Sequence, residues 1–175
     1  MSKKIFIFRG PPASGKGTIT EKFIENVAPP VAFLELDVFR WRFHQNNRPI
    51  SEVSDQEHRF AYENYLSVLE NYLENGDYTI VTEGLFSWDT DGSHGCMQDI
   101  LHLADRYGFK SYPILMHAKR SILWQRNQAR EYSVPKEEFD ELYDYVMNQR
   151  SDEEIAIDTG DLSVQEAVQQ LSEYI

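Results

Sequence analysis

The chain has 175 residues, of which 41% are hydrophobic and 26% are charged, and its formal net charge at pH 7 is -12. This length and composition are typical of one globular domain with a substantial core, so we expect residues 1–175 to form a single domain. No apolar run approaches the length of a membrane span, about 18 residues. A strongly acidic chain also gains little from counterion release on nucleic acid, which argues against a general nucleic-acid binder.

The negative charge is concentrated near the carboxyl end. Residues 131–175 hold 13 acidic and 2 basic residues, whereas residues 1–130 are nearly neutral. We interpret the acidic segment as a solvated surface that aids solubility, with a docking role as the alternative. The single cysteine, Cys96, cannot form an internal disulfide, and only four apolar residues follow one another near the amino end, too few for a signal peptide. We therefore expect a cytoplasmic protein.

Short runs rich in β-forming residues alternate with longer helical patterns along the chain. The predicted strands cover residues 4–8, 31–36, 78–82, 111–117 and 154–157. The predicted helices cover residues 16–27, 38–46, 55–75, 96–107, 120–131, 136–149 and 164–174. Ser54 with Glu57, and Ser163 with Glu166, have the spacing of capping boxes at helix starts. This alternation predicts an α/β fold in which helices cover both faces of a parallel sheet.

The first predicted strand leads into a turn that carries G-x-x-x-x-G-K, from Gly10 to Lys16. Glycines let the backbone bend so that successive N–H groups point at a phosphate chain. The helix that follows adds its positive end, and Lys16 adds a mobile cation. We therefore predict that a nucleotide's phosphates bind Gly10, Pro11, Pro12, Ala13, Ser14, Gly15, Lys16, Gly17 and Thr18.

The residue after the lysine departs from the usual form of this motif. Gly17 stands where a serine or threonine hydroxyl normally ligates Mg²⁺, and Thr18 follows it. The resulting G-K-G-T sequence resembles that of adenylate kinases and related small kinases. Because Mg²⁺ keeps several waters in such sites, we expect Thr18 to contact the metal through water.

Polar residues follow the second predicted strand, at the edge of the sheet where ligands bind in folds of this kind. Asp37 comes directly after that strand, and Arg40 lies one helical turn further on. A carboxylate beside a phosphate loop can orient an acceptor hydroxyl and take its proton during phosphoryl transfer. The alternative is that Asp37 caps the predicted helix at 38–46.

A phosphate loop followed by a second strand that ends in D-x-x-R resembles the small P-loop kinases that phosphorylate hydroxyl groups. Members of this group include the polynucleotide 5′-kinase domain, chloramphenicol phosphotransferase, gluconate kinase and shikimate kinase. The resemblance implies the P-loop NTPase fold, a three-layer sandwich around a five-stranded parallel sheet. It also implies that Asp37 is the base or substrate-holding carboxylate and that Arg40 lies near the acceptor or the transferring phosphate. Adenylate kinases lack this aspartate, which argues against a nucleoside-monophosphate kinase.

The same resemblance gives roles to Glu83 and to two arginines. Glu83 ends the third predicted strand, where many P-loop enzymes hold the waters of Mg²⁺ with a carboxylate; the alternative is an ordinary polar residue at a strand end. Arg126 and Arg130 are four residues apart on the predicted helix at 120–131, which leads into a short lid around 120–135. In the family, the first arginine stacks on adenine and the second reaches the phosphates. The alternative is a solvated basic face that pairs with the acidic segment.

The segment after the fifth predicted strand, I-D-T-G-D-L-S, resembles the carboxyl-terminal motif of many small kinases. In those proteins this loop passes behind the adenine and contacts it through backbone groups. The resemblance therefore implies that Thr159 and Gly160 contribute to the nucleotide site.

The acceptor site has weaker support in the sequence. The polar segment with Arg42, His44, Asn46, Asn47 and Arg48, and the loop at 87–95, are the candidates to line it. An isolated histidine such as His94 is more often a surface or capping residue than a catalyst. No cluster of residues has the spacing of zinc ligands.

Together these features predict an ATP- and Mg²⁺-dependent kinase that acts on a small hydroxyl-bearing acceptor. The predicted catalytic residues are Lys16, Asp37, Arg40 and Arg130. A nucleoside or nucleotide kinase is one alternative. A module that binds ATP without transferring phosphate is an alternative of another class.

Overall fold

A computed structural model describes residues 3–41, 43, 53–89 and 94–175. The strands are β1 (Lys4–Arg9), β2 (Val31–Glu35), β3 (Thr79–Gly84), β4 (Lys110–His117) and β5 (Ile155–Asp158). The helices are α1 (Lys16–Ile24), α2 (Leu36–Trp41), α3 (Asp55–Asn75), α4 (Met97–Arg106), α5 (Arg120–Gln128), α6 (Lys136–Met147) and α7 (Val164–Leu171), with a 3₁₀ turn, η2 (Ser172–Tyr174), after α7. All the predicted strands and helices are therefore present, with shifted ends.

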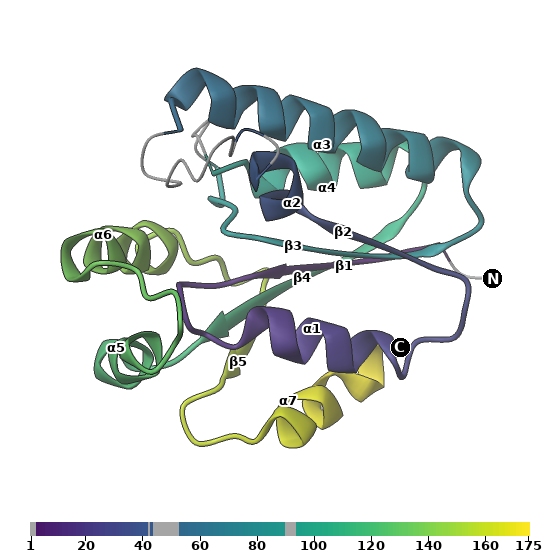
Figure 1. The fold of residues 1–175 in the computed structure, drawn as a ribbon. Coiled ribbons are helices and arrows are strands. Elements are labelled where there is room, and N and C mark those ends of the chain that lie inside the picture. The colour runs from purple at the N-terminus through teal and green to yellow at the C-terminus, as the bar shows by residue number, and fades with distance from the viewer. Residues whose placement is uncertain (1–2, 42, 44–52, 90–93) are drawn as a thin grey trace.

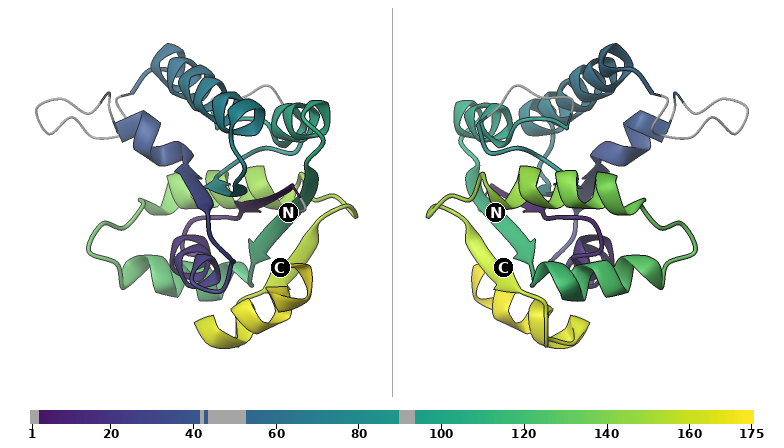
Figure 2. Two further views of the ribbon diagram at one scale, coloured as in Figure 1. Left: turned by 90° about the vertical axis from the view of Figure 1, so that its right-hand side faces the viewer. Right: turned by 90° about the vertical axis from the view of Figure 1, so that its left-hand side faces the viewer.

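The five strands form one parallel sheet in the order β2-β3-β1-β4-β5. Helices α3 and α4 cover one face and α1 and α7 cover the other (Figures 1 and 2). Side chains alternate between the faces of a strand. On β1, Ile5 and Ile7 pack into the core under α3 and α4, whereas Phe6 and Phe8 pack into the core under α1 and α7. This confirms the three-layer α/β sandwich.

Helix starts follow the sequence signals more closely than helix ends. Both capping boxes form, at Ser54 with Glu57 and at Ser163 with Glu166. The predicted helix at 120–131, by contrast, ends at Gln128. The side chain of Asn127 makes two hydrogen bonds to the backbone of Val134, at 2.7 and 3.0 Å, which turn the chain from α5 toward α6. Arg130 therefore lies beyond the helix, and the helical-spacing argument that placed it beside Arg126 is wrong.

The predicted helix at 38–46 begins earlier than expected, at Leu36, and its described part ends at Trp41. Its remaining positions, apart from Phe43, lie outside the described residues. Within the residues that the structure describes, none of the helices combines the length and the apolar character that a membrane crossing requires.

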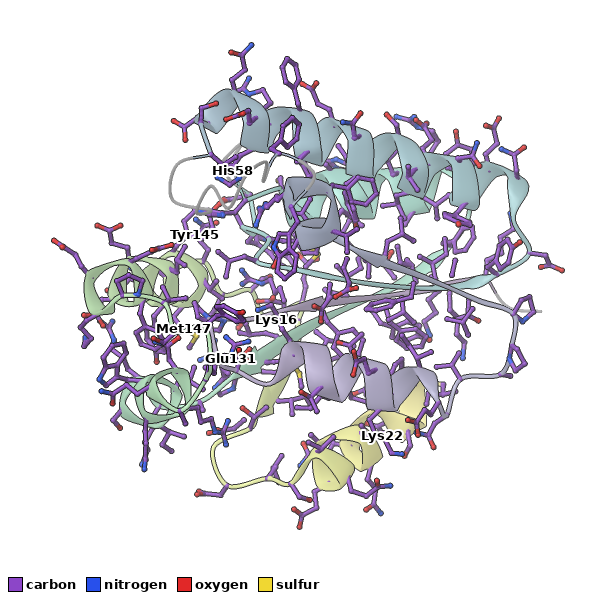
Figure 3. The ribbon with its side chains drawn as sticks, viewed as in Figure 1. Lys16, Lys22, His58, Glu131, Tyr145 and Met147 are labelled. Carbon is purple, nitrogen blue, oxygen red and sulfur yellow. The ribbon has the colours of Figure 1, made fainter. Side chains whose placement is uncertain are left out.

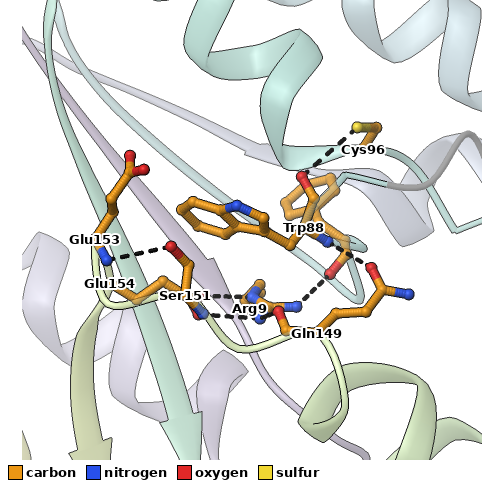
Figure 4. A network of polar contacts seen from close by, with 8 residues as sticks. Arg9, Trp88, Cys96, Gln149, Ser151, Glu153 and Glu154 are labelled. Atoms are coloured by element: carbon orange, nitrogen blue, oxygen red, sulfur yellow. Dashed lines mark hydrogen bonds and ion pairs between the residues drawn. The ribbon is translucent and has the colours of Figure 1, made fainter.

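A buried polar network ties together three segments at the carboxyl end of the sheet (Figure 4). Arg9, the last residue of β1, is completely buried and forms an ion pair with Glu154. Its guanidinium also donates to the carbonyl oxygens of Phe86, at 3.0 Å, and Gln149, at 2.6 Å. The side chain of Gln149 accepts the backbone N–H of Trp88 at 2.9 Å. These bonds fix the segments after β3 and α6 against the end of β1.

Candidate functional site

The phosphate loop needs its first two motif glycines for different reasons. A Cβ atom on Gly10 would lie 2.3 Å from the carbonyl oxygen of Met116, so only glycine lets β1 approach β4 this closely. Gly15 precedes the first turn of α1 with φ at +86°, the left-handed region that favours glycine. Ala13 also has a positive φ of 62°, and the N–H of Ser14 closes the turn on the carbonyl oxygen of Pro11 at 3.2 Å.

The start of α1 differs from the starts of α3 and α7. Those two helices begin with capping boxes, whereas no side chain caps α1. The N–H groups of Lys16, Gly17 and Thr18 precede the first intrahelical bond, from Ile19 to Gly15, so the helix itself gives them no acceptor. An uncapped helix start with its positive dipole end is a ready binding site for an anion such as a phosphate group.

A cavity of about 290 Å³ lies against this helix start. It is lined by Ala13, Ser14, Gly15, Lys16, Gly17, Thr18, Asp37, Glu83, Arg126 and Arg130. The structure thus brings most of the predicted site residues to one place. Gly10 and Pro11 are buried behind the loop and do not line this cavity, and neither do Pro12, Arg40, Thr159 and Gly160.

Carboxylates gather on one wall of this first cavity. Glu83, the residue before the last of β3, lies beside Glu35 of β2, its partner in the strand register. Asp37 follows two residues after Glu35. Burial raises the pKa of Glu83, with added repulsion from Glu35 and Asp37, while Lys16 acts in the opposite direction. Burial and Asp37 likewise raise the pKa of Glu35.

These carboxylates fit a magnesium ion that arrives with a nucleotide. The Oε2 atom of Glu83 is buried without a hydrogen-bond partner, and a Cβ atom on Gly17 would lie 3.7 Å from its Oε1 atom. Because Gly17 has no side chain, the carboxylate of Glu83 lies close to the loop. Across the described ranges, no three or more His, Cys, Asp or Glu side chains form a metal cage. A bound Mg²⁺ would therefore take most of its ligands from phosphates and water.

Asp37 is the second residue of α2, so it is not the N-cap of that helix. Its carboxylate is 51% exposed, and its Oδ1 atom accepts a hydrogen bond from Nη1 of Arg40 at 3.0 Å. The Arg40 side chain is 5% exposed. Burial lowers the pKa of Arg40, and the neighbouring Asp37 charge opposes that change. Arg40 therefore holds one side of a carboxylate that stays open to the cavities.

A second cavity of about 560 Å³ adjoins the first. It is lined by Pro12, Lys16, Asp37, Arg40, Val53, Asp55, His58, Leu85, His94, Arg130, Val134, Glu138, Glu141 and Leu142. Lys16, Asp37 and Arg130 line both cavities, and they form the junction between them. Lys16, His58 at the start of α3 and Tyr145 of α6 lie toward the same end of the molecule, whereas Lys22 lies at the far end of α1 (Figure 3).

The basic residues around α5 have distinct partners. Arg120 forms ion pairs with Asp140 and Asp144 of α6. Of these three arginines, Arg120, rather than Arg126 or Arg130, is therefore the one with a described ion pair to a carboxylate of the acidic segment. Arg126 donates to the carbonyl oxygens of Thr159, at 2.7 Å, and Gly160, at 3.0 Å.

Thr159 links the loop after β5 to the phosphate loop. The hydroxyl of Thr159 lies 3.0 Å from the carbonyl oxygen of Ser14 and 3.1 Å from that of His117. Thr159 is only 2% exposed. Arg126 and Gly160 extend the same connection toward α5. The direct adenine contacts predicted for Arg126, Thr159 and Gly160 stay predictions, and the observed bonds join the three elements that would surround the base.

Sequence reasoning missed part of the second cavity. Asp55 and His58 lie one turn apart at the start of α3, and Glu138 and Glu141 have the same spacing on α6. Polar residues three apart at a helix start are a signal that could have found them. His94, which the sequence favoured as a surface or capping residue, lines this cavity and is partly buried. The other candidates, Arg42, His44, Asn46, Asn47 and Arg48, lie outside the described residues.

The fold and the loop define a P-loop α/β domain. The model of the AAA domain family matches residues 5–147, so the chain belongs to that family. None of the curated proteins matches the chain.

Solved structures of small kinases share the fold. A candidate kinase from Chloroflexus aurantiacus has a TM-score of 0.74 and 17% identity, with 99% of this chain and 96% of that chain covered. Shikimate kinase from Bacteroides thetaiotaomicron has a TM-score of 0.61 and 20% identity, with 99% and 98% covered. A gluconokinase from Sinorhizobium meliloti has a TM-score of 0.61 and 17% identity, with 98% and 95% covered. The architecture is therefore that of the small P-loop kinases.

Proposed function

We propose that this protein is an ATP-dependent phosphotransferase that transfers the γ-phosphate of ATP to a hydroxyl group of a small molecule. The observation that carries the proposal is the meeting of two cavities at Lys16, Asp37 and Arg130. The first cavity lies against the phosphate loop and suits the phosphates of a nucleotide. The second cavity has the size of a small-molecule site. A carboxylate and two cations at their junction suit an in-line phosphoryl transfer.

Each residue at the junction has a distinct role in this reaction. Bound Mg²⁺-ATP would supply the phosphoryl group, and the divalent charge would offset the negative charge of its phosphates. Asp37 orients the acceptor hydroxyl and takes its proton while the new oxygen–phosphorus bond forms and the bond to the β-phosphate oxygen breaks, which leaves ADP. Lys16, the N–H groups at the start of α1 and Arg130 stabilise the negative charge on the transferred group.

The remaining predicted residues support these groups. Arg40 is a positioning residue, because its guanidinium holds Oδ1 of Asp37 from the buried side. We assign Glu83 and Thr18 to the waters of the metal ion, since both line the cavity beside Gly17. Arg126 belongs to the nucleotide side, where its bonds to Thr159 and Gly160 hold the loop after β5.

Replacement of Lys16 tests this proposal. Lys16→Ala removes a cation that is needed most in the transition state, so we expect kcat to fall about 10²- to 10³-fold. The dissociation constant for ATP should change far less. The matched control is Lys22→Ala on the same helix, because Lys22 pairs with Glu25 and lies at the other end of α1 (Figure 3). The measurements are ADP release with Mg²⁺-ATP over an acceptor panel and calorimetry of ATP binding.

Two results would contradict the proposal in different ways. Full turnover by Lys16→Ala on an identified acceptor would remove Lys16 from catalysis. Tight ATP binding by the native protein, with no acceptor-stimulated ADP release over sugars, sugar acids, nucleosides, antibiotics and oligonucleotide ends, would instead indicate a module that senses ATP.

A further inference from the structure

The charged residues of the second cavity fall into two groups. Lys16 and Arg130 belong to the junction with the first cavity, where a nucleotide's phosphates would meet them. Arg40 is bonded to Asp37. The other charged residues that the structure places in this lining are Asp55, Glu138 and Glu141, and all three are negative. This acidic wall, defined as Asp55, Glu138 and Glu141, lies on α3 and α6.

The acidic wall differs from two other carboxylates of α6, Asp140 and Asp144, which form ion pairs. Asp140 and Asp144 are neutralised by Lys136 and Arg120 on the side of α6 that faces α5. Within the described residues, no ion pair involves the three carboxylates of the acidic wall. The wall therefore keeps its negative charge toward the space that an acceptor would fill.

Two histidines complete this part of the cavity. His58 and His94 have ring centroids 6.2 Å apart, and the Nδ1 atom of each is buried without a hydrogen-bond partner. Burial and the charge of Arg40 lower the pKa of His58, and they lower the pKa of His94 to about 4. Both imidazoles are then neutral at pH 7. A neutral imidazole offers one donor and one acceptor, which suits hydroxyl groups and gives no attraction for a carboxylate.

We propose that the acceptor is an alcohol that also carries an amino group with a positive charge, and that the acidic wall selects it over alcohols that carry a carboxylate or a phosphate. This inference rests on the proposed function. The neutral His58 and His94 bind hydroxyl groups of the acceptor, and Asp55, Glu138 and Glu141 attract its ammonium group. Shikimate and gluconate, which name two of the neighbouring structures, are carboxylates and would be repelled by the same wall.

The first test uses acceptors in matched sets that share one skeleton, such as glucose, glucosamine and glucuronate. Turnover is measured as ADP release from Mg²⁺-ATP, with the phosphorylated product identified by mass spectrometry. We expect kcat/KM for the amino member of the productive set to exceed that of the carboxylate member by at least about tenfold. A preferred carboxylate or phosphate member would overturn the inference.

Binding of Mg²⁺-ATP without turnover in any set, or loss of that binding, would instead overturn the proposed function, so the two failures are distinguishable. A second test changes the wall itself. In the double variant Glu138→Gln and Glu141→Gln, we expect KM for the amino acceptor to rise about tenfold with little change in kcat. KM for the uncharged member should stay near that of the native protein. An equal rise for both acceptors would indicate a purely structural effect and would overturn the inference.

The matched control is Glu137→Gln. Glu137 lies on the same turn of α6 but does not line the cavity. The substitution Glu137→Gln removes one negative charge from α6, as each substitution in the wall does, and it should leave KM for both acceptors unchanged. A rise in KM for the amino acceptor in this control would show that general charge, rather than the acidic wall, is responsible.

Discussion

Two arginine–carboxylate pairs lie at the carboxyl end of the same sheet, and they differ mainly in exposure. In the pair of Arg9 and Glu154, the side chains are 0% and 1% exposed. In the pair of Arg40 and Asp37, the arginine is 5% exposed but the carboxylate is 51% exposed. Both pairs place a buried guanidinium beside an acid near the end of a strand. The difference shows how one chemical pair serves either to hold loops together or to present a reactive group.

The surroundings of each pair explain the difference. Carbonyl oxygens of Phe86 and Gln149 accept further hydrogen bonds from the buried Arg9, so protein groups alone surround the first pair (Figure 4). The open side of Asp37 lines both cavities. A fully buried pair is costly to break, whereas an exposed carboxylate contributes little to stability because water screens it. The comparison therefore predicts opposite responses to substitution.

The largest expected effect is on the rate of the open pair. Asp37→Asn keeps the shape of the side chain but removes the base, so we expect kcat to fall about 10²- to 10⁴-fold. The free energy of unfolding should change by no more than about 1 kcal/mol, since the carboxylate is half-exposed. ADP-release kinetics and urea unfolding measure the two quantities. Asp77→Asn, at an exposed position between α3 and β3, is the control. Native turnover in Asp37→Asn would contradict the role of Asp37 as the base.

The next largest effect is on the stability of the closed pair. Glu154→Gln leaves the Arg9 charge buried and unpaired, and we expect the free energy of unfolding to fall by about 3 to 5 kcal/mol. Urea unfolding measures this loss, and kcat of the folded fraction should stay near the native value.

If that single variant does not fold, the double variant Arg9→Met and Glu154→Leu removes both charges. It should recover much of the lost stability, because apolar replacements often substitute for buried pairs. If the free energy of unfolding fell no more in Glu154→Gln than in Asp37→Asn, the predicted difference between the two pairs would be wrong.

The contrast between the pairs also marks what the sequence could predict. The phosphate loop, the five strands and Asp37 follow from local patterns, because glycine spacing and hydrophobic alternation are short-range signals. The Arg9 network was not predictable in this way, since Arg9 and its partner Glu154 are 145 residues apart in the chain. Only the order of the strands in the sheet, with β4 between β1 and β5, brings the two residues together. The acidic wall depends in the same way on how α3 and α6 face each other across the cavity.

The end of α5 shows a second limit. The sequence pattern at 120–131 continues the helix through Arg130, but the bonds from Asn127 to Val134 end it at Gln128. A side chain that bonds to a backbone seven residues away competes with the helix, and propensity alone does not reveal it. Arg126 and Arg130 still line one cavity, although not through the helical spacing that the sequence suggested, and their roles stay predictions.

The smallest expected effect is on the pH dependence of stability, through the charge of Arg40 acting on His94. It sharpens the comparison because the charge of Arg9, unlike that of Arg40, is neutralised by a fully buried carboxylate. Burial, and then the charges of Arg40 and His58, lower the pKa of His94 to about 4, while Asp37 acts in the opposite direction. In the unfolded chain this histidine has a pKa near 6.5, whereas in the folded chain its pKa is about 4. Stability should therefore fall as the pH drops from 7 to 5, by about 1 to 2 kcal/mol from this residue.

The variant His94→Gln removes that contribution, so its free energy of unfolding should depend less on pH than that of the native protein. Urea unfolding at pH 7, 6 and 5 measures the difference, and other titrating groups, such as Glu83 with its raised pKa, cancel in the comparison. His102→Gln, at an exposed position on α4, should leave the native pH dependence unchanged. Equal pH dependence in the native protein and His94→Gln would mean that His94 is charged in the folded state at pH 5.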